Sequence, residues 1–248
     1  MMRRLDTSAM CLTLMLAGGM LAPEPARSAA YPVNVCVGRK QNDAGNYCKA
    51  VFHAWSAWET SQDSGRRDRS LQRAATRVAA RWARAEANAR RQGTDCTDTT
   101  LGSAAAQSLI DGAVGGIVTA INAGLDLGSA ANARCGRALL SAAALDCAGI
   151  LTAEGIHVRD LQGDADGTVR DAALAAASAA FGRAWTEQIG AGCPTTATQG
   201  DIEGGIDAVA ADLVTTPSCR PTSTTPSSRP THRPARRAIS AGTSRRSA

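Results

Sequence analysis

The chain has few of the residues from which metal and catalytic sites are built. Its three histidines, His53, His157 and His232, lie far apart in the 248-residue sequence. Their spacing to one another and to the cysteines matches no zinc-binding pattern. The sequence has neither the Gly-x-Ser-x-Gly turn of many hydrolases nor the His-Glu-x-x-His helix of zinc peptidases. We therefore expect no metal and no cofactor, and we favour a non-enzymatic protein over an enzyme.

Long uninterrupted apolar runs are also scarce. The apolar stretch at 109–127 contains two aspartates and an asparagine, so we expect no membrane-spanning segment after residue 30. Residues 10–22 form a shorter apolar run that follows two arginines, and small residues at 28–30 come after it. This pattern is typical of a secretory signal peptide. We expect residues 1–30 to be a signal peptide and the protein to be secreted or periplasmic.

Lysine is nearly absent, and charge is spread unevenly. Only Lys40 and Lys49 among the 27 basic residues are lysine, so arginine is the default cation in this chain. Residues 31–128 carry a net charge of +3 and residues 129–214 carry −6, whereas residues 215–248 have seven arginines and no acid. The basic pI therefore comes from the C-terminal tail and not from the part expected to fold.

The most informative feature is an internal repeat of cysteines. The spacing of twelve residues between the first and second cysteine is the same in both copies, and the next spacing is 48 residues in one copy and 46 in the other. An Ile-Asp step follows the third cysteine by fourteen or thirteen residues. The repeated residues are Cys36, Cys48, Cys96 and Ile110-Asp111 in residues 31–128, and Cys135, Cys147, Cys193 and Ile206-Asp207 in residues 129–214. We interpret these two ranges as tandem copies of one unit.

Each copy is rich in alanine and has apolar residues at helical spacing, as in Leu71, Ala75, Val78 and Trp82. Clusters of Gly, Asp and Ser at 63–65 and 163–167 are typical of turns between helices. The sequence therefore predicts an all-α protein of two three-helix repeats, each a helical hairpin followed by a third helix. In the third helix of the first copy, Gly112 and Gly116 favour close packing on the hairpin.

The hairpin layout predicts two disulfide bonds. Residues that face each other in an antiparallel hairpin are equally far from its turn, and this condition pairs Cys36 with Cys96 and Cys135 with Cys193. Cys36 is not expected to bond Cys48, because twelve helical residues span about 18 Å and a disulfide joins Cα atoms roughly 4.4–6.8 Å apart. Each bond would close the open end of its hairpin.

The segment from Cys193 through Pro194-Thr195-Thr196 to Ile206-Asp207 resembles a module of secreted bacterial helical repeat proteins whose function is uncharacterised. Residues 96–111 look like a more divergent copy. The resemblance implies a fourth cysteine after the Ile-Asp step as the partner of the second. Gly112, Ala113, Ala208 and Val209 occupy that region here.

Two interpretations of Cys48 and Cys147 follow from the missing fourth cysteine. The simpler is a pair of buried free thiols that act as small apolar residues. The other is a bond between Cys48 and Cys147, which leaves Cys219 unpaired. Cys219, beside Arg220, is in either case the one candidate for an exposed thiol, and a redox-sensing role for it stays open.

Two charged patterns have both a functional and a structural interpretation. Asp160, Asp164 and Asp166 faintly resemble a calcium loop, but the acidic residue that such a loop needs further on is missing, and a helix cap by Asp166 or Thr168 is favoured. The arginines of the second helix recur every three or four residues, at Arg69, Arg73, Arg77, Arg81 and Arg84. They form either a face for an anionic polymer or nucleic acid or, as we favour, an ordinary solvated face.

Residues 215–248 are rich in Ser, Thr, Pro and Arg and nearly devoid of large apolar residues, so we expect a disordered tail. Its arginines either contact an anionic envelope polymer or nucleic acid, or only add solubility. They are Arg220, Arg229, Arg233, Arg236, Arg237, Arg245 and Arg246. The leading hypothesis is an exported, non-enzymatic structural or binding module of the cell envelope or extracellular space. The alternative is an enzyme, for example a hydrolase, with an unrecognised site between the repeats.

Overall fold

The computed structural model describes residues 31–97 and 100–214, and within them it has six α-helices and no β-strand. The predicted turn at 163–167 lies between α4 and α5, whereas the break near the predicted turn at 63–65 falls at residues 62–63, because Ser64 and Gly65 already belong to α2. The helices are α1 (Tyr31–Ser61), α2 (Ser64–Arg91), α3 (Ser103–Asn122), α4 (Ala130–Arg159), α5 (Thr168–Gly190) and α6 (Gln199–Val214). The prediction of an all-α fold is confirmed.

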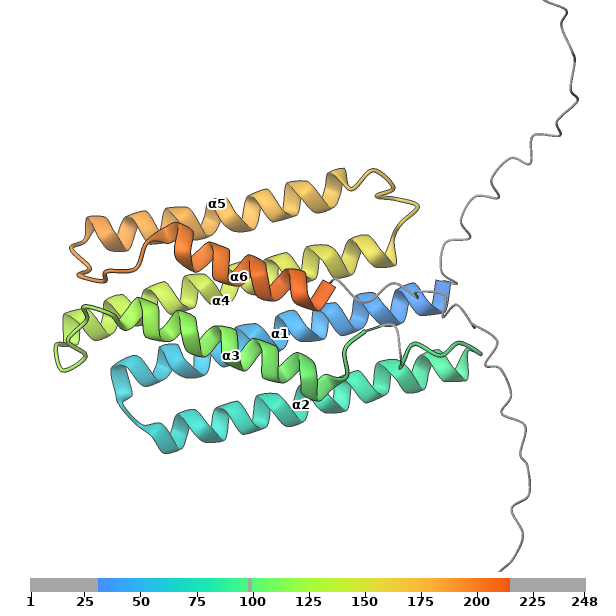
Figure 1. Cartoon of the computed structure of the whole chain (residues 1–248), viewed down its shortest axis with the longest axis horizontal. Coiled ribbons are helices and arrows are strands. Elements are labelled where there is room, and N and C mark those ends of the chain that lie inside the picture. The colour runs from blue at the N-terminus through green and yellow to red at the C-terminus, as the bar shows by residue number, and fades with distance from the viewer. Residues whose placement is uncertain (1–30, 98–99, 215–248) are drawn as a thin grey trace, which may run out of the picture. The chain divides into compact units, whose positions relative to one another are not determined.

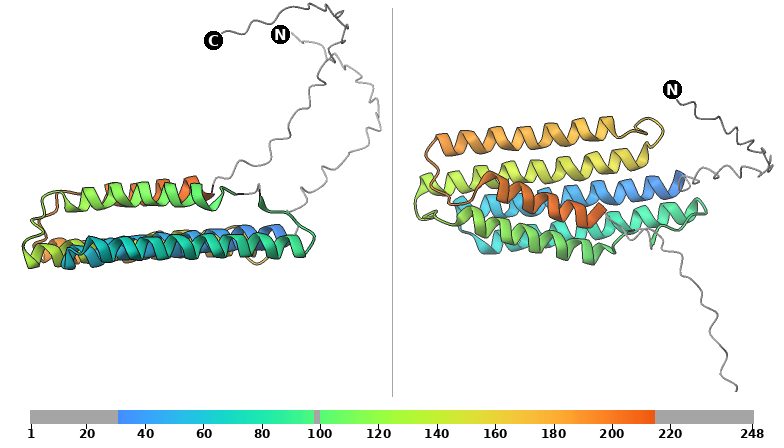
Figure 2. Two further views of the ribbon diagram at one scale, coloured as in Figure 1. Left: turned by 90° about the horizontal axis from the view of Figure 1, so that it is seen from below. Right: turned by 45° about the horizontal axis from the view of Figure 1, so that its top comes forward.

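The helices form two layers. The four long helices lie side by side in the order α2, α1, α4, α5, with α1 and α4 in the middle (Figure 1). The shorter helices α3 and α6 cover one face of that layer (Figure 2, left). The opposite face of the four-helix layer carries no further helix from the described residues, and this leaves the junction between α1 and α2 accessible there.

Small residues bring α1 and α4 into close contact. A Cβ atom placed on Gly155 would lie 2.6 Å from the carbonyl oxygen of Gly38, and one placed on Gly38 would clash with the carbonyl of Gly155. Towards the other end of the interface, the Ser56 hydroxyl donates a hydrogen bond of 3.1 Å to the Arg137 carbonyl. These pairs show that the helices are antiparallel. Glycine at both crossing positions allows backbones to meet without a side chain between them. The expectation that Gly112 and Gly116 of α3 favour close packing is wrong, because open space surrounds both positions.

One large apolar core joins all six helices, and a small second cluster surrounds the Cys36–Cys96 bond. The fully buried members of the large core come from α1, α3, α4, α5 and α6, and Val78 and Trp82 extend it into α2. The largest of the fully buried residues are Phe52, Ile110, Ile121, Leu139, Leu140, Leu151, Ile202 and Ile206. The core therefore runs through both halves of the chain. Leu71 and Ala75, which we predicted on the apolar face of α2, are only half-buried, and Ala74 takes the buried position.

Three disulfide bonds link the described cysteines. Cys36 is bonded to Cys96, and Cys135 is bonded to Cys193, as the hairpin layout predicted. Cys48 is bonded to Cys147 between the two central helices, where both residues are fully buried. The interpretation of these two cysteines as free thiols is therefore wrong. Its error was to treat each half as a separate packing unit, whereas α1 and α4 meet along most of their length.

A buried lysine closes the end of the α1–α2 hairpin beside the Cys36–Cys96 bond. The Lys40 side chain is fully buried, and its ammonium lies 2.9 Å from a carboxylate oxygen of Glu86. It also donates to the Cys96 carbonyl at 2.8 Å and to the Thr100 hydroxyl at 2.9 Å. The three acceptors satisfy all three ammonium hydrogens.

The acidic turn before α5 is a helix cap and holds no calcium-type cluster. Asp164 accepts hydrogen bonds from the backbone N–H groups of Val169 at 2.8 Å and Arg170 at 3.1 Å. Its carboxylate also lies 2.9 Å from Nδ1 of His157. The N-cap residue is Gly167, so the expectation that Asp166 or Thr168 takes this position is wrong. Asp166 accepts a hydrogen bond of 3.1 Å from the Thr168 N–H, and the left-handed backbone at Gly167 (φ 75°) places Asp164 under the first turn of α5.

Candidate functional site

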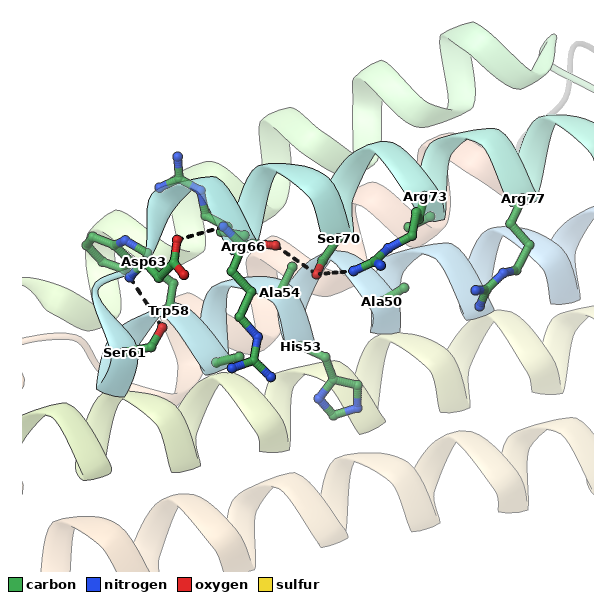
Figure 3. A pocket seen from close by; sticks show the side chains of 13 residues that line it. Ala50, His53, Ala54, Trp58, Ser61, Asp63, Arg66, Ser70, Arg73 and Arg77 are labelled. Carbon is green, nitrogen blue, oxygen red and sulfur yellow. Dashed lines mark hydrogen bonds between the residues drawn. The ribbon is translucent and has the colours of Figure 1, made fainter.

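An open groove of about 510 Å³ runs between α1 and α2. Half of the residues in its α1 wall are alanines, whereas its α2 wall carries long cationic side chains. This difference in side-chain size leaves a trough above the alanines. The lining residues are Ala50, His53, Ala54, Ala57, Trp58 and Ser61 from α1, Asp63 from the turn, and Arg66, Arg67, Ser70, Arg73, Ala74 and Arg77 from α2 (Figure 3).

Three arginines on one face of α2 dominate the charge of the groove. Arg66, Arg73 and Arg77 are separated by seven and four residues, which places them in one row along a helix. Arg73 donates to the Ser70 hydroxyl at 3.3 Å. Within the described part of the chain, no carboxylate lies within 4.0 Å of any of the three guanidinium groups. Their charge is therefore available to a ligand.

The one carboxylate that lines the groove is already engaged. Asp63 is the N-cap of α2, and its side chain accepts a hydrogen bond of 2.8 Å from the backbone N–H of Arg66. A capping carboxylate is held at the positive end of the helix dipole. The charge of Asp63 therefore acts mainly on the N-terminus of α2 and less on the arginine row.

One end of the groove is held by aromatic packing. The guanidinium of Arg67 lies 4.3 Å from the ring centre of Trp55 and 5.7 Å from that of Trp58. The two tryptophans themselves pack edge to face, and Arg67 also pairs with Asp68 at 2.8 Å. Arg67 is thus committed to contacts within the fold, and it fixes the position of the arginine row next to it.

His53 lies in the groove opposite the arginine row (Figure 3). Partial burial, followed in importance by the nearby Lys49 ammonium, lowers the pKa of His53 below its ordinary value. A neutral imidazole at pH 7 offers one hydrogen-bond donor and one acceptor and no additional charge. His53 can therefore contribute to selectivity without changing the electrostatic balance of the site.

The arginine pattern seen in the sequence is divided by the structure. Arg73 and Arg77 line the groove, whereas Arg69 is exposed outside it. Arg81 turns towards Asp43 of α1 at 3.5 Å, so its charge is partly compensated. Sequence reasoning missed Arg66, although this residue directly follows the predicted turn and is spaced one heptad from Arg73.

A second groove, of about 370 Å³, lies between α4, α5 and α6 and is acidic. Asp146, Glu203 and Asp207 line it, and burial followed by repulsion from the other two carboxylates raises the pKa of Asp146 to about 6. A buried carboxyl of raised pKa between the repeats would favour the alternative of an enzyme. Asp146 lies within the second half of the chain. The carboxyl that fits this description better is Glu59 of α1, which is fully buried beside Gly136 of α4 and accepts a hydrogen bond of 2.9 Å from Asn122. Burial raises the pKa of Glu59 above its ordinary value.

The remaining predicted residues do not form a site in the described part of the chain. The six cysteines are all in disulfides, and His157 belongs to the α5 cap. No group of three His, Cys, Asp or Glu residues in residues 31–97 and 100–214 is arranged to hold a metal ion. Cys219, His232 and the arginines of the tail lie outside the described residues.

Two of the helices, α3 and α4, are long and apolar enough to cross a membrane if length and composition alone are considered. This is weak evidence, because the core helix of a soluble protein passes the same test. Here α4 packs against α1, α3, α5 and α6, so its apolar composition matches its central position.

No protein-family model, curated protein or solved structure matches this chain. The resemblance to secreted helical repeat proteins therefore stays a prediction that rests on short motifs.

Proposed function

We propose that this protein is an exported, non-enzymatic binding module that holds an anionic polymer along the arginine groove between α1 and α2. The observation that carries the proposal is the row formed by Arg66, Arg73 and Arg77 beside the alanines of α1, three cations that have no carboxylate partner among residues 31–97 and 100–214. Guanidinium groups bind sulfate, phosphate and carboxylate oxygens through paired N–H donors.

The length of the row favours a polymer over a single small anion. Eleven residues separate Arg66 from Arg77, which corresponds to about 16 Å along a helix. One phosphate or sulfate group spans only a fraction of that distance. An extended chain with a negative charge at each repeat unit matches several arginines at once and gains from each contact.

Export is supported by the disulfides. Three bonds join six buried or half-buried cysteines, and such bonds persist in oxidising compartments outside the cytoplasm. Together with the signal-like pattern of residues 1–30, they support a periplasmic or extracellular location. In either place the module would meet the anionic polymers of the cell envelope.

We also propose that α1–α3 and α4–α6 are two copies of one unit. A shift of 99 residues superposes Cys48 on Cys147, its own bonding partner. The same shift carries Gly38 onto Arg137 and, in the opposite direction, Gly155 onto Ser56. The Gly38–Gly155 contact therefore corresponds to the contact between Arg137 and Ser56. Such an exchange is expected when a twofold axis passes between two related units.

In this scheme the seven arginines of residues 215–248 add a second, nonspecific attraction for the same polymer. The folded groove then supplies orientation, and the tail increases the local concentration of the polymer.

An enzymatic role has less support. Within the described residues, the His53 side chain makes no hydrogen bond to a Ser, Cys or carboxylate side chain of the groove, so no nucleophile–base pair is present there.

Binding of residues 31–248 and 31–214 to fluorescently labelled dextran sulfate tests the proposal. We expect both to bind at low salt and to release the polymer at high salt, with the shorter chain binding more weakly. If residues 31–214 fold but do not bind at any salt concentration, the groove has no role in polymer binding and the proposal is wrong.

A further inference from the structure

The acidic groove arises where the two halves of the chain differ. In the first half, the Tyr47 hydroxyl donates a hydrogen bond of 2.8 Å to a carboxylate oxygen of Asp111. The matching positions of the second half, judged from the cysteine and Ile-Asp registers, are Asp146 and Asp207. An aspartate is shorter than a tyrosine and, when ionised, has no proton to donate. The second half therefore has an open groove and an unmatched pair of carboxylates at this place.

The groove has an acidic side and an apolar side. Asp146 comes from α4, and Glu203 and Asp207 come from α6. Glu203 is held in place by hydrogen bonds from Ser178 at 2.9 Å and Gln199 at 3.3 Å. The apolar lining consists of Ile150 from α4 and Leu174 and Ala175 from α5. Within the described residues, no Lys or Arg lies within ion-pair distance of the three carboxylates.

Asp146 is the member of this set that most needs a ligand. It is only 3% exposed, and its Oδ1 atom is buried without a hydrogen-bond partner among the described residues. The charges that act on it are those of Glu203 and Asp207, and both are negative. Burial also raises the pKa of Asp207. Buried polar atoms are nearly always hydrogen-bonded, so an unpartnered carboxylate oxygen at the wall of a groove indicates a missing donor.

We propose that this groove binds the ammonium group of an aliphatic amine. An ammonium group has N–H donors for the unpartnered Asp146 carboxylate and one positive charge that the three negative side chains attract. The alkyl chain that carries it would lie against Ile150 and Leu174. A metal ion fits less well, because within the described residues no three such groups are arranged as a ligand cluster. The ammonium needs direct contact only with the Asp146 carboxylate, while Glu203 and Asp207 attract it through their charges. The ammonium belongs either to a free diamine or to a lysine side chain of a larger molecule.

Calorimetric titration with 1,4-diaminobutane and, separately, with Nα-acetyl-lysine amide tests the inference. We expect the wild-type protein to bind at least one of the two, and the tighter of them identifies the source of the amine. Asp146→Asn keeps the shape of the side chain and removes its charge, and we expect it to weaken binding at least tenfold. Asp212→Asn removes the same charge from an exposed position of α6 outside the groove, and it should change the affinity by less than twofold.

A measurement on the unmutated protein covers the case in which Asp146→Asn does not fold. In carbon-detected NMR titrations, saturating amine should shift the midpoint of the Asp146 carboxyl to lower pH by at least half a unit. Absence of binding by both probes, equal losses in the two variants, or an unchanged Asp146 midpoint would each overturn the inference. The arginine groove plays no part in this site, so failure here leaves the proposed polymer binding untouched.

Discussion

The bond between Cys48 and Cys147 should be one of the strongest single contributions to stability in the molecule. It joins the centres of α1 and α4, and both cysteines are completely buried. The double variant Cys48→Ala/Cys147→Ala removes the bond without leaving a free thiol. Alanine is also a good helix former, so the two helices themselves should persist.

The size of the effect depends on the length of the loop that this bond closes. The Cys36–Cys96 bridge shortens the covalent path from Cys48 to Cys147 to about 63 residues, compared with 99 along the chain, whereas the Cys135–Cys193 bridge does not shorten it. By the chain-entropy estimate, closing a loop of that length stabilises the fold by about 4 kcal/mol. Loss of the two buried sulfur atoms adds on the order of 1 kcal/mol.

Urea unfolding followed by circular dichroism measures this loss. The matched control is Cys36→Ala/Cys96→Ala, which opens a loop of 60 residues and should therefore lose a similar amount. The reasoning would be refuted if the Cys48/Cys147 variant lost less than 1 kcal/mol of unfolding free energy while the control lost about 4 kcal/mol. Recovery of Cys48 and Cys147 in alkylated form from non-reduced wild-type protein would refute the bond itself.

Three other substitutions test the packing and the buried charges. Gly38→Ala places a methyl group against the backbone of α4 and should destabilise the protein by about 2 kcal/mol or more in urea unfolding. The control Gly112→Ala has open space around its Cβ and should be neutral or stabilise the protein by up to about 1 kcal/mol. Equal effects of the two substitutions would contradict the close contact between α1 and α4. The folded protein holds a proton on Asp146 up to about pH 6, whereas the unfolded chain releases it near pH 4. As the pH rises from about 4 to 6, the stability of the wild-type protein should therefore fall by about 1–3 kcal/mol relative to Asp146→Asn. A relative rise over the same range would contradict the raised pKa. Lys40→Met leaves Glu86 without its cation and should lower stability by about 3 kcal/mol in thermal unfolding, and a loss below 1 kcal/mol would show that the pair is dispensable.

The helices and two of the disulfides could be predicted because their signals are local. Alanine-rich segments of helical periodicity end at turns rich in Gly, Asp and Ser, and residues equally far from a turn face each other. Cys36 and Cys96 satisfy that condition without any knowledge of the rest of the fold. The same holds for Cys135 and Cys193.

The interface between the two halves was not predictable in this way. The Cys48–Cys147 bond depends on α1 lying antiparallel against α4, and the signals for that packing were single glycines, Gly38 and Gly155, more than a hundred residues apart. The cap of α5 was misplaced for a similar reason, because Asp164 reaches its backbone donors only through the left-handed turn at Gly167.

The groove also depended on tertiary structure. The sequence showed regularly spaced arginines on α2, but their value as a site depends on which of them face the alanines of α1. Arg73 and Arg77 do, whereas Arg81 meets Asp43 and Arg69 faces solvent. Helical spacing defines a face, and only the packing of α1 decides what lies opposite that face.

The most direct test of polymer binding is the salt dependence of dextran sulfate affinity for Arg73→Gln/Arg77→Gln in the chain of residues 31–214. The control is Arg69→Gln/Arg90→Gln, which removes the same charge from exposed positions of α2 outside the groove. Each lost contact reduces the slope of log affinity against log salt by on the order of one unit. We predict a slope shallower by one to two units and at least tenfold weaker binding for the groove variant alone. Equal slopes and affinities for the two variants would show that only net charge matters, and would contradict a polymer site in this groove.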